Sequence, residues 1–460
     1  MPHLDTAVAS PLVRTPRGPS PSWAVRFEIA RALGGMALLP VRVGGFLLAR
    51  DALRAELVRA LAAPAAVAAA PHPRLPSRPL TIFVSCAEAS GEIHAVSLVR
   101  ALRARARAAG APEPRCVGLG GARLAQEGVE LIGRPVERAG MGLSDPWKNV
   151  GYYVDLLRDA ATFLRAHAPD VCVPVDSPAL HVPLAHIAQR YRVPVAHFVT
   201  PQYWGWAPWR ASGYRSAVDL ALSILPFEPA WFEKRGIPVR HVGHPLLDAL
   251  PPVAPAREDG TLVLLPGSRR GVVERNLPWM LAVARAVHER CAVARVAIVH
   301  EDRALEPLLR EHVSAAGAGG FVEIVIGDLH TELARARAAL TVSGTILIDL
   351  LHARVPSVVV YRLAHARETF LARRLLTVPW FSSVNLLANE EVFPEFSFHG
   401  DGPRDAVVDA LARAYADDAW RARCRTSLER AARALGPPGA ADRAAGHALA
   451  LAVRATEREH

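Results

Sequence analysis

The sequence predicts an α/β protein with two Rossmann-like domains, each built on a parallel sheet. From Leu80 onward, short apolar runs alternate with segments of helical length, which is typical of strand–helix–strand units. A Pro/Ala/charged connector at residues 251–259 divides the alternation into two series. The length of 460 residues also exceeds what one hydrophobic core usually holds. Because ligands bind outside the carboxyl ends of such strands, we expect a cleft between the two domains.

The composition narrows the range of partners. Hydrophobic residues make up 51% and charged residues 21%, as in globular proteins. The net charge is +10, but the basic residues are scattered arginines, with lysine only at Lys148 and Lys234. A nucleic-acid partner is therefore not predicted, whereas a phospholipid surface or a sugar nucleotide is compatible with the charge. The five cysteines form no CxxC pair, which predicts buried thiols in a reducing cytosol.

Residues 1–79 form a predicted N-terminal extension and linker. Residues 1–21 are rich in Pro, Ser and Arg and are expected to be disordered, and no signal peptide is predicted. Residues 34–49 are apolar, but Pro40 and Arg42 interrupt them and they are short for a membrane span. We expect an amphipathic membrane-surface element with Trp23 and Phe27 as interfacial anchors, or a helical pair packed on the main body. The Ala/Pro-rich residues 62–79 predict a linker and a domain boundary.

The first α/β domain is predicted at residues 80–250. A strand at residues 80–85 leads into Glu-Ala-Ser-Gly-Glu at residues 88–92, which opens a helix. Further strands are expected at residues 116–119, 170–175, 193–199, 220–225 and 239–242, with a long helix at 150–167. Residues 200–206 form an aromatic loop after one of these strands.

The second α/β domain is predicted at residues 260–400, followed by Ala/Arg-rich helices at 401–460. Its first strand runs into Pro-Gly-Ser-Arg at residues 266–269, and strands at 296–299 and 322–326 follow. Residues 340–361 then read as a strand, a turn, a helix and another strand.

Asp176 is the candidate general base. It ends an otherwise uncharged apolar strand, so an apolar wall lies behind its carboxylate at the expected cleft. Desolvation raises the pKa of such a group towards the range that suits a base. The structural alternative is an aspartate that caps the next helix.

Three further residues are candidates on the same side. Glu88 and Glu92 are placed to orient a sugar or the base, or else to cap the helix that they open. The motif is not GxGxxG, so NAD binding is not predicted. His244 is a candidate for the cleft floor, although a lone histidine is more often structural.

Two turns in the second domain suit a diphosphate. Gly267, Ser268 and Arg269 combine a close-approach turn with a guanidinium, which neutralises charge as a diphosphate departs. Ser343, Gly344 and Thr345 form the other turn at a helix start, and Asp349 lies one helical turn further as an acceptor for ribose hydroxyls. A βαβ unit without ligand is the alternative. No metal is indicated, because ligand-like Asp-x-Asp or His clusters are missing from the sequence.

Eight motifs in order resemble the lipid-A-disaccharide synthase family, whose members are GT-B glycosyltransferases, over about residues 80–400. The motifs lie at residues 87–92, 175–178, 199–206, 225–228, 242–248, 264–269, 343–349 and 385–387. The resemblance implies transfer of 2,3-diacylglucosamine from its UDP derivative to the 6-hydroxyl of 2,3-diacylglucosamine 1-phosphate, with inversion and without a metal. It also implies a site of action at the cytoplasmic face of the bacterial inner membrane. Carried over, Asp176 is the base, Arg269, Gly344 and Thr345 contact the diphosphate, Asp349 binds ribose, and Asn385 lies near the nucleotide.

Several positions depart from the family pattern. Ala87, Glu92 and Asp349 replace Gly, Asp and Glu, and Val272 stands in place of an acid. Ala179 and His181 replace Asp and Asn after the candidate base, and Phe398 replaces a Gln. These departures leave two alternatives open: a UDP-GlcNAc 2-epimerase-like enzyme, and a non-catalytic paralogue that binds lipid or nucleotide. Acceptor identity, acyl-chain length and oligomeric state stay open as well.

Overall fold

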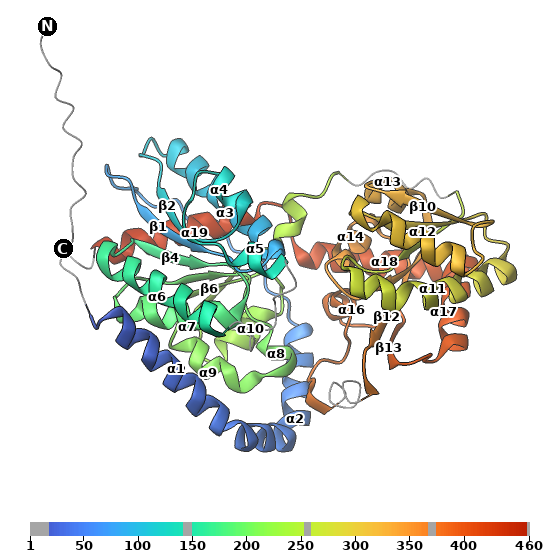
Figure 1. The fold of residues 1–460 in the computed structure, drawn as a ribbon, viewed down its shortest axis with the longest axis horizontal. Coiled ribbons are helices and arrows are strands. Elements are labelled where there is room, and N and C mark those ends of the chain that lie inside the picture. The colour runs from blue at the N-terminus through green and yellow to red at the C-terminus, as the bar shows by residue number, and fades with distance from the viewer. Residues whose placement is uncertain (1–17, 141–149, 253–258, 367–373, 458–460) are drawn as a thin grey trace, which may run out of the picture.

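The computed structural model describes residues 18–140, 150–252, 259–366 and 374–457. Most of the segment expected to be disordered, residues 1–17, lies outside the described residues. Two α/β lobes stand side by side in Figure 1, the N-terminal lobe in blue and green and the C-terminal lobe in yellow and orange. Within the described residues, the strands of both lobes pair in parallel, as the sequence predicts.

The N-terminal lobe contains two short sheets that adjoin. One has the order β3-β2-β1-β4 and the other β5-β6-β7, and bridges from Cys172 to Val195 and from Val175 to Phe198 connect β4 to the β5 segment. The strand order thus reverses between β1 and β4, which is where open α/β sheets bind ligands. The strands are β1 Thr81–Ser85, β2 Arg115–Leu119, β3 Glu130–Gly133, β4 Val171–Pro174, β5 Ala196–Phe198, β6 Leu220–Ser223 and β7 Val239–His241.

Helices cover these sheets because their apolar faces and the buried strands form one core. The long ones are α3 Ala89–Ala108, α6 Val150–His167 and α7 Pro178–Arg190. The short ones are α4 Ala122–Gln126, α5 Pro135–Gly140, α8 Tyr203–Trp206, η1 Pro208–Arg210, α9 Ala211–Arg215, α10 Glu228–Glu233 and η2 Pro245–Asp248.

The C-terminal lobe has a single sheet with the order β10-β9-β8-β11-β12-β13, so its strand order reverses between β8 and β11. The strands are β8 Thr261–Leu265, β9 Arg295–His300, β10 Val322–Ile326, β11 Ala336–Val342, β12 Ser357–Leu363 and β13 Glu395–His399. Its helices are α11 Arg270–Cys291, η3 Arg303–Leu305, α12 Glu306–Ala315, α13 Leu329–Arg335, α14 Ile346–Ala353, α16 Ser383–Ala388 and α17 Arg404–Ala416.

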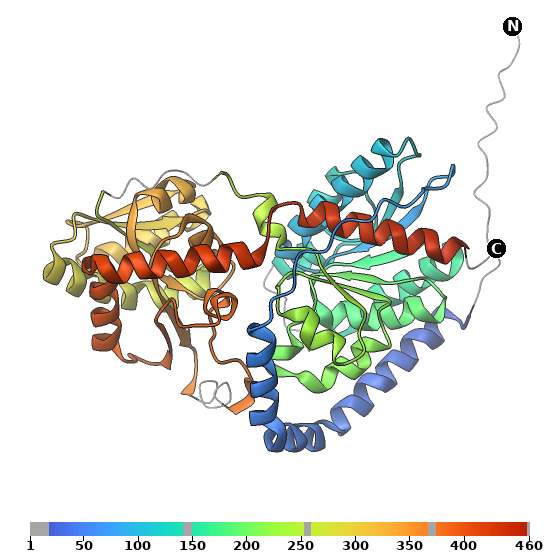
Figure 2. The same ribbon diagram turned by 180° about the vertical axis from the view of Figure 1, so that it is seen from behind.

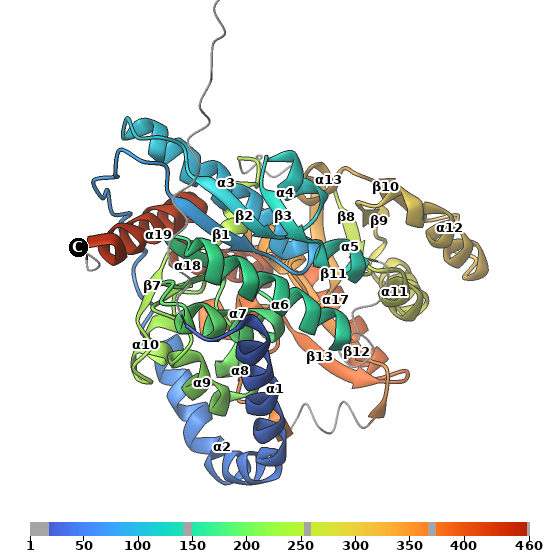
Figure 3. The same cartoon turned by 60° about the vertical axis from the view of Figure 1, so that its left-hand side comes forward.

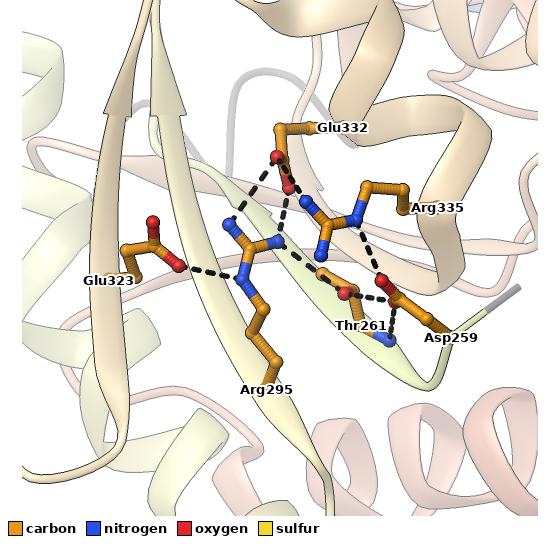
Figure 4. A network of polar contacts seen from close by, with 6 residues as sticks. All are labelled: Asp259, Thr261, Arg295, Glu323, Glu332 and Arg335. Carbon is orange, nitrogen blue, oxygen red and sulfur yellow. Dashed lines mark hydrogen bonds and ion pairs between the residues drawn. The ribbon is translucent and has the colours of Figure 1, made fainter. Parts of the chain in front are cut away.

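A polar network ties together the amino ends of β10, β9 and β8 in this lobe (Figure 4). Arg295, the first residue of β9, donates to Glu323 at 2.7 Å and pairs with Glu332 of α13. Arg335 donates to Asp259 at 2.7 Å, directly before β8. Because these contacts lie at the amino ends, they support the sheet at the edge opposite the expected ligand site.

The C-terminal helices do not form the separate unit predicted at 401–460. α17 packs on α11, α18 (Asp418–Leu435) packs on α16 and α14, and α19 (Ala440–Glu457) returns to pack on α3 of the N-terminal lobe. Figure 2 shows α18 and α19 in red, crossing the near side of the C-terminal and the N-terminal lobe in turn. The small residues of α19 allow this close packing, with Ala444, Ala445 and Ala448 fully buried.

The N-terminal extension also belongs to the N-terminal lobe. α1 (Pro21–Ala37) packs on α6 and α7, and α2 (Leu39–Leu61) packs on α10 (Figure 3). Two partly buried ion-pair groups hold it, one centred on Glu28 and one on Glu56. The expected linker lies along the same lobe, since Ala68 donates its N–H to the His241 carbonyl at 2.7 Å. Position 79 is therefore not a boundary between separately packed bodies.

The helices α1 and α2 meet at a bend of 53°. Within the described ranges, no single helix has the length and apolarity of a membrane span, but this bent pair has them jointly. We call residues 33–48 the elbow. Large apolar side chains are exposed there, including Leu33 at 60%, Val41 at 73% and Leu48 at 93%. The extension thus packs on the main body, as one sequence interpretation expects, and still leaves an apolar surface.

Candidate functional site

The strand-order reversal in the N-terminal lobe brings two candidate segments together. Residues 86–88 follow β1, and Asp176 follows β4. A Cβ placed on Gly91 would lie 3.4 Å from the Val175 carbonyl oxygen and 3.7 Å from the Asp176 Cβ. The first turn of α3 therefore packs directly against Asp176.

Asp176 is a partly buried carboxylate with a raised pKa. Burial raises it, a backbone hydrogen bond from Ser177 opposes the rise, and the charge of Glu88 adds to it. The residue preceding α7 is Ser177, so Asp176 is not the helix cap of the structural alternative. The direction of the shift is the one expected from an acid at the end of an apolar strand.

The two glutamates at the start of α3 differ in exposure and in their contacts. Glu88 is exposed, occupies the N-cap position of α3 without a side-chain cap bond, and lies close enough to act on Asp176. Glu92 is buried, and its carboxylate accepts the Leu124 N–H at 3.1 Å at the start of α4. Glu92 therefore ties α3 to α4, and its carboxylate is engaged in packing.

His244 follows β7 and is only 8% exposed. Its Nδ1 accepts the Leu246 N–H at 3.3 Å. Burial, with the neighbouring His94 and His241, lowers its pKa to about 3, so the imidazole is neutral at physiological pH. These contacts give His244 a structural role, and the described contacts do not join it to Asp176.

In the C-terminal lobe, the two predicted diphosphate turns follow two paired strands, β8 and β11. Gly267 has φ +112°, and a Cβ there would lie 3.3 Å from Val342 Cγ2 and 2.5 Å from Val272 Cγ1. Only glycine fits between these neighbours. Val272, which stands where the family resemblance implies an acid, thus closes the back of the turn.

These turns begin two helices at the same edge. α11 starts after the exposed pair Ser268 and Arg269, and α14 starts after the exposed Gly344 and Thr345. Neither N-cap residue makes a side-chain cap bond. The first N–H groups of a helix have no intrahelical acceptor, so adjacent helix starts favour an anion between them.

Asp349 lies one turn into α14, partly buried, and its pKa is raised by burial while His330 opposes the rise. The Nε2 atom of His330 is 3.9 Å from Asp349 Oδ1. His330 and Glu301, whose charge also acts on Asp349, were not among the sequence candidates. Their position after strands could have identified them in the sequence, because Glu301 follows β9 and His330 follows β10, two neighbouring strands of the sheet that carries the two turns.

Asn385 is fully buried and uses its amide within the lobe. Its Oδ1 accepts the N–H groups of Val392 and Phe393, and its Nδ2 donates to the Phe393 carbonyl and to Glu395. The side chain therefore fixes the chain between α16 and β13. The resemblance implies that Asn385 lies near the nucleotide, but its amide is already engaged in hydrogen bonds within the lobe.

The described residues contain no group of three or more His, Cys, Asp or Glu placed to hold a metal ion. All five cysteines are free thiols, and four of them are buried, as the sequence predicts.

Comparisons with known proteins agree on a family. The family model described as lipid-A-disaccharide synthetase matches residues 82–414. The lipid-A-disaccharide synthase of Syntrophus aciditrophicus is 31% identical over 380 residues, covering 80% of this chain and 97% of the relative. That of Myxococcus xanthus is 32% identical over 388 residues, covering 82% and 98%.

Solved structures show the fold. A putative UDP-N-acetylglucosamine 2-epimerase from Listeria monocytogenes has a TM-score of 0.53 at 14% identity, covering 83% of this chain and 98% of that one. The MnaA–UDP structure from S. aureus also has a TM-score of 0.53, at 15% identity, covering 79% and 94%. At such identities the likeness extends to the fold alone. The epimerase alternative is not favoured, because the family model and the relatives are those of lipid-A-disaccharide synthases. The chain belongs to the lipid-A-disaccharide synthase family and is a UDP-sugar-dependent glycosyltransferase with the GT-B fold.

Proposed function

We propose that this glycosyltransferase transfers 2,3-diacylglucosamine from its UDP derivative to the 6-hydroxyl of 2,3-diacylglucosamine 1-phosphate. The products are lipid A disaccharide 1-phosphate and UDP, and the configuration at the anomeric carbon of the donor sugar is inverted. The observation that carries the proposal is the pair of adjacent turns after β8 and β11, which suits a nucleoside diphosphate in a chain of this family.

In this proposal Asp176 removes the proton of the acceptor hydroxyl as its oxygen attacks C1 of the donor sugar. The bond from C1 to the diphosphate oxygen breaks, and UDP departs with the bonding electrons. The starts of α14 and α11, with the guanidinium of Arg269, stabilise the charge that develops on UDP. Asp349 accepts hydrogen bonds from the ribose.

The proposal includes no metal ion, because Arg269 and the helix N–H groups meet the charge of the diphosphate. Burial raises the pKa of Asp176, and the charge of the exposed Glu88 adds to that rise. Glu92, His244 and Asn385 support the fold in this scheme, because their polar atoms are engaged within the lobes.

The proposed partners also include a membrane surface, the cytoplasmic face of the inner membrane, where acylated substrates reside. The exposed elbow supports this, since its leucine, valine and methionine side chains suit the acyl boundary. The sequence between Glu28 and Asp51 contains arginines and no acid, which favours anionic lipid headgroups.

Mass spectrometry of the products tests the proposed function. The purified chain is incubated with UDP-2,3-diacylglucosamine and 2,3-diacylglucosamine 1-phosphate, and we expect one disaccharide phosphate and one UDP per turnover. A parallel incubation with UDP-GlcNAc alone is expected to give no UDP-ManNAc. Tight UDP binding without disaccharide would instead identify a non-catalytic paralogue.

A further inference from the structure

Asp176 lies in a strained part of the backbone. Its φ is +58°, the following Ser177 has φ +44°, and Val199, which follows the neighbouring β5, has φ +63°. The left-handed region is unfavourable for residues with a side chain, and most so for a β-branched valine. Such conformations persist only where surrounding contacts hold them, and they concentrate at functional sites.

Two histidines hold the carbonyl of Asp176. His181 Nδ1 lies 2.5 Å from the Asp176 carbonyl oxygen, and His197 Nε2 lies 3.1 Å from the same atom. A carbonyl only accepts, so both nitrogens carry hydrogen and donate. The other nitrogen of His181 then accepts from the Ser85 hydroxyl, at 2.8 Å.

The two imidazoles are fully buried and neutral. Burial lowers the pKa of His181 to about 4 and that of His197 to about 3. Their tautomers are thus fixed by hydrogen bonds, and protonation does not disturb them at neutral pH. Because neither ring reaches solvent, neither contacts a substrate.

These contacts fix both polar groups of the Asp176 backbone. Its N–H donates to the Phe198 carbonyl at 2.9 Å, and its carbonyl accepts from the two rings. The rings belong to α7 and β5, and Ser85 is the last residue of β1. Three elements of the lobe therefore set the direction in which the Asp176 side chain leaves the backbone.

We infer that His181 and His197 are positioning residues that aim the Asp176 carboxylate at the acceptor hydroxyl. The inference rests on the proposed function, in which Asp176 is the base. His181 stands where the family resemblance implies Asn, so this chain places an imidazole donor behind its candidate base. A misplacement of about 1 Å reduces turnover on the order of 10²-fold, so loss of either ring is expected to lower kcat.

A double-mutant cycle tests the inference. His181→Leu and His197→Phe, made separately, are expected to lower kcat about 10-fold or more and to leave KM for the UDP-sugar within about 2-fold. In the Asp176→Asn background the same changes are expected to lower kcat by less than about 2-fold, because there is no base left to aim. His181→Asn, which keeps an N–H donor, is expected to recover part of the loss.

His241→Phe is the matched control. His241 is 2% exposed and contacts the Ser223 carbonyl at 3.3 Å, without a described contact to Asp176. We expect it to lower the thermal midpoint and to leave kcat within about 2-fold. If the histidine variants do not fold, Ser85→Ala frees the His181 tautomer with little change in volume. It is expected to lower kcat several-fold only when Asp176 is present.

The outcomes separate the two proposals. An equal fractional loss of kcat in both backgrounds, or unchanged kcat in the histidine and Ser85 variants, would overturn the positioning role alone. Unchanged turnover in Asp176→Asn itself would remove the base, and the positioning role with it.

Discussion

Asp176 and Asp170 flank the same strand, and their surroundings give the two carboxylates opposite tasks. Asp170 precedes β4, is 7% exposed, and accepts from Arg78 at 2.6 and 2.9 Å and from the Thr81 N–H at 2.7 Å. Asp176 follows β4, and its pKa is raised by burial. A paired carboxylate stabilises the fold, whereas a desolvated one retains a tendency to take up a proton, which suits a base.

Asp176→Asn is expected to lower kcat by about 10²–10⁴-fold. In the unmodified chain, kcat/KM is expected to fall as the pH drops through the raised pKa of Asp176, because only the carboxylate accepts a proton. A raised folded-state pKa means that this group's contribution to stability decreases as the pH rises through that pKa. The asparagine variant is therefore expected to unfold at the same or a higher temperature at neutral pH.

The pH profile of product formation and the thermal midpoint check this prediction. Asp170→Asn serves as the control, because it breaks a buried ion pair and is expected to lower the midpoint without moving the acid limb of the profile. An acid limb that stays in place with full turnover in Asp176→Asn would contradict the assignment.

At the scale of elements, the elbow differs from the rest of α1 and α2. Glu28 anchors α1 to the lobe through Arg190, and Glu56 anchors α2 through Lys234 and Arg235. Between these anchors, Val41 and Leu48 extend into solvent. Deleting the whole extension would uncover α6, α7 and α10, so surface substitutions test membrane binding more cleanly.

The double variant Val41→Asp/Leu48→Asp is expected to weaken partitioning onto anionic phospholipid vesicles by at least about 10-fold. Insertion of two aliphatic side chains contributes on the order of 1.5–3 kcal/mol each, and the new charges add repulsion from the headgroups. Vesicle co-sedimentation at fixed salt measures the effect. Val58→Asp, on α2 beyond the elbow and 39% exposed, is the control that should bind like the unmodified chain. Equal binding of the double variant would refute the elbow as the contact.

At the scale of the whole molecule, Asp248 of the N-terminal lobe holds the start of the last helix. Its carboxylate accepts the N–H groups of Gly439, directly before α19, and of Ala440 and Ala441, the first residues of α19. Arg105 of α3 then pairs with Asp442 at 2.6 and 2.8 Å. The last helix is thereby fastened to the helix whose first turn packs against Asp176.

Asp248→Ala is expected to lower the free energy of unfolding by about 0.5–2 kcal/mol, the usual effect of losing a helix cap. Asp442→Ala removes a carboxylate that is 55% exposed, so it is expected to lose at most about 1 kcal/mol. Urea unfolding followed by tryptophan fluorescence compares the two. A larger loss for Asp442→Ala than for Asp248→Ala would show that the ion pair, and not the cap, holds α19.

The sequence by itself determined the α/β class, the two series of strands, the strand-end turns and the order of the family motifs. These depend on residues close together in the chain: apolar runs, Gly-Ser turns and helical spacing. The adjacency of Gly267 and Val342 also followed, because parallel strands bring their carboxyl ends to one edge.

Only the tertiary structure decided which polar side chains already form hydrogen bonds to other parts of the chain. Glu92 is engaged by Leu124, Asn385 by the residues before β13, and Asp248 by a helix 191 residues later. The two histidines behind Asp176 likewise come from separate elements. A hydrogen bond between distant residues has no period or spacing in the sequence. A capping carboxylate and a ligand-binding one are therefore alike until the chain has folded and shown which of them is already paired.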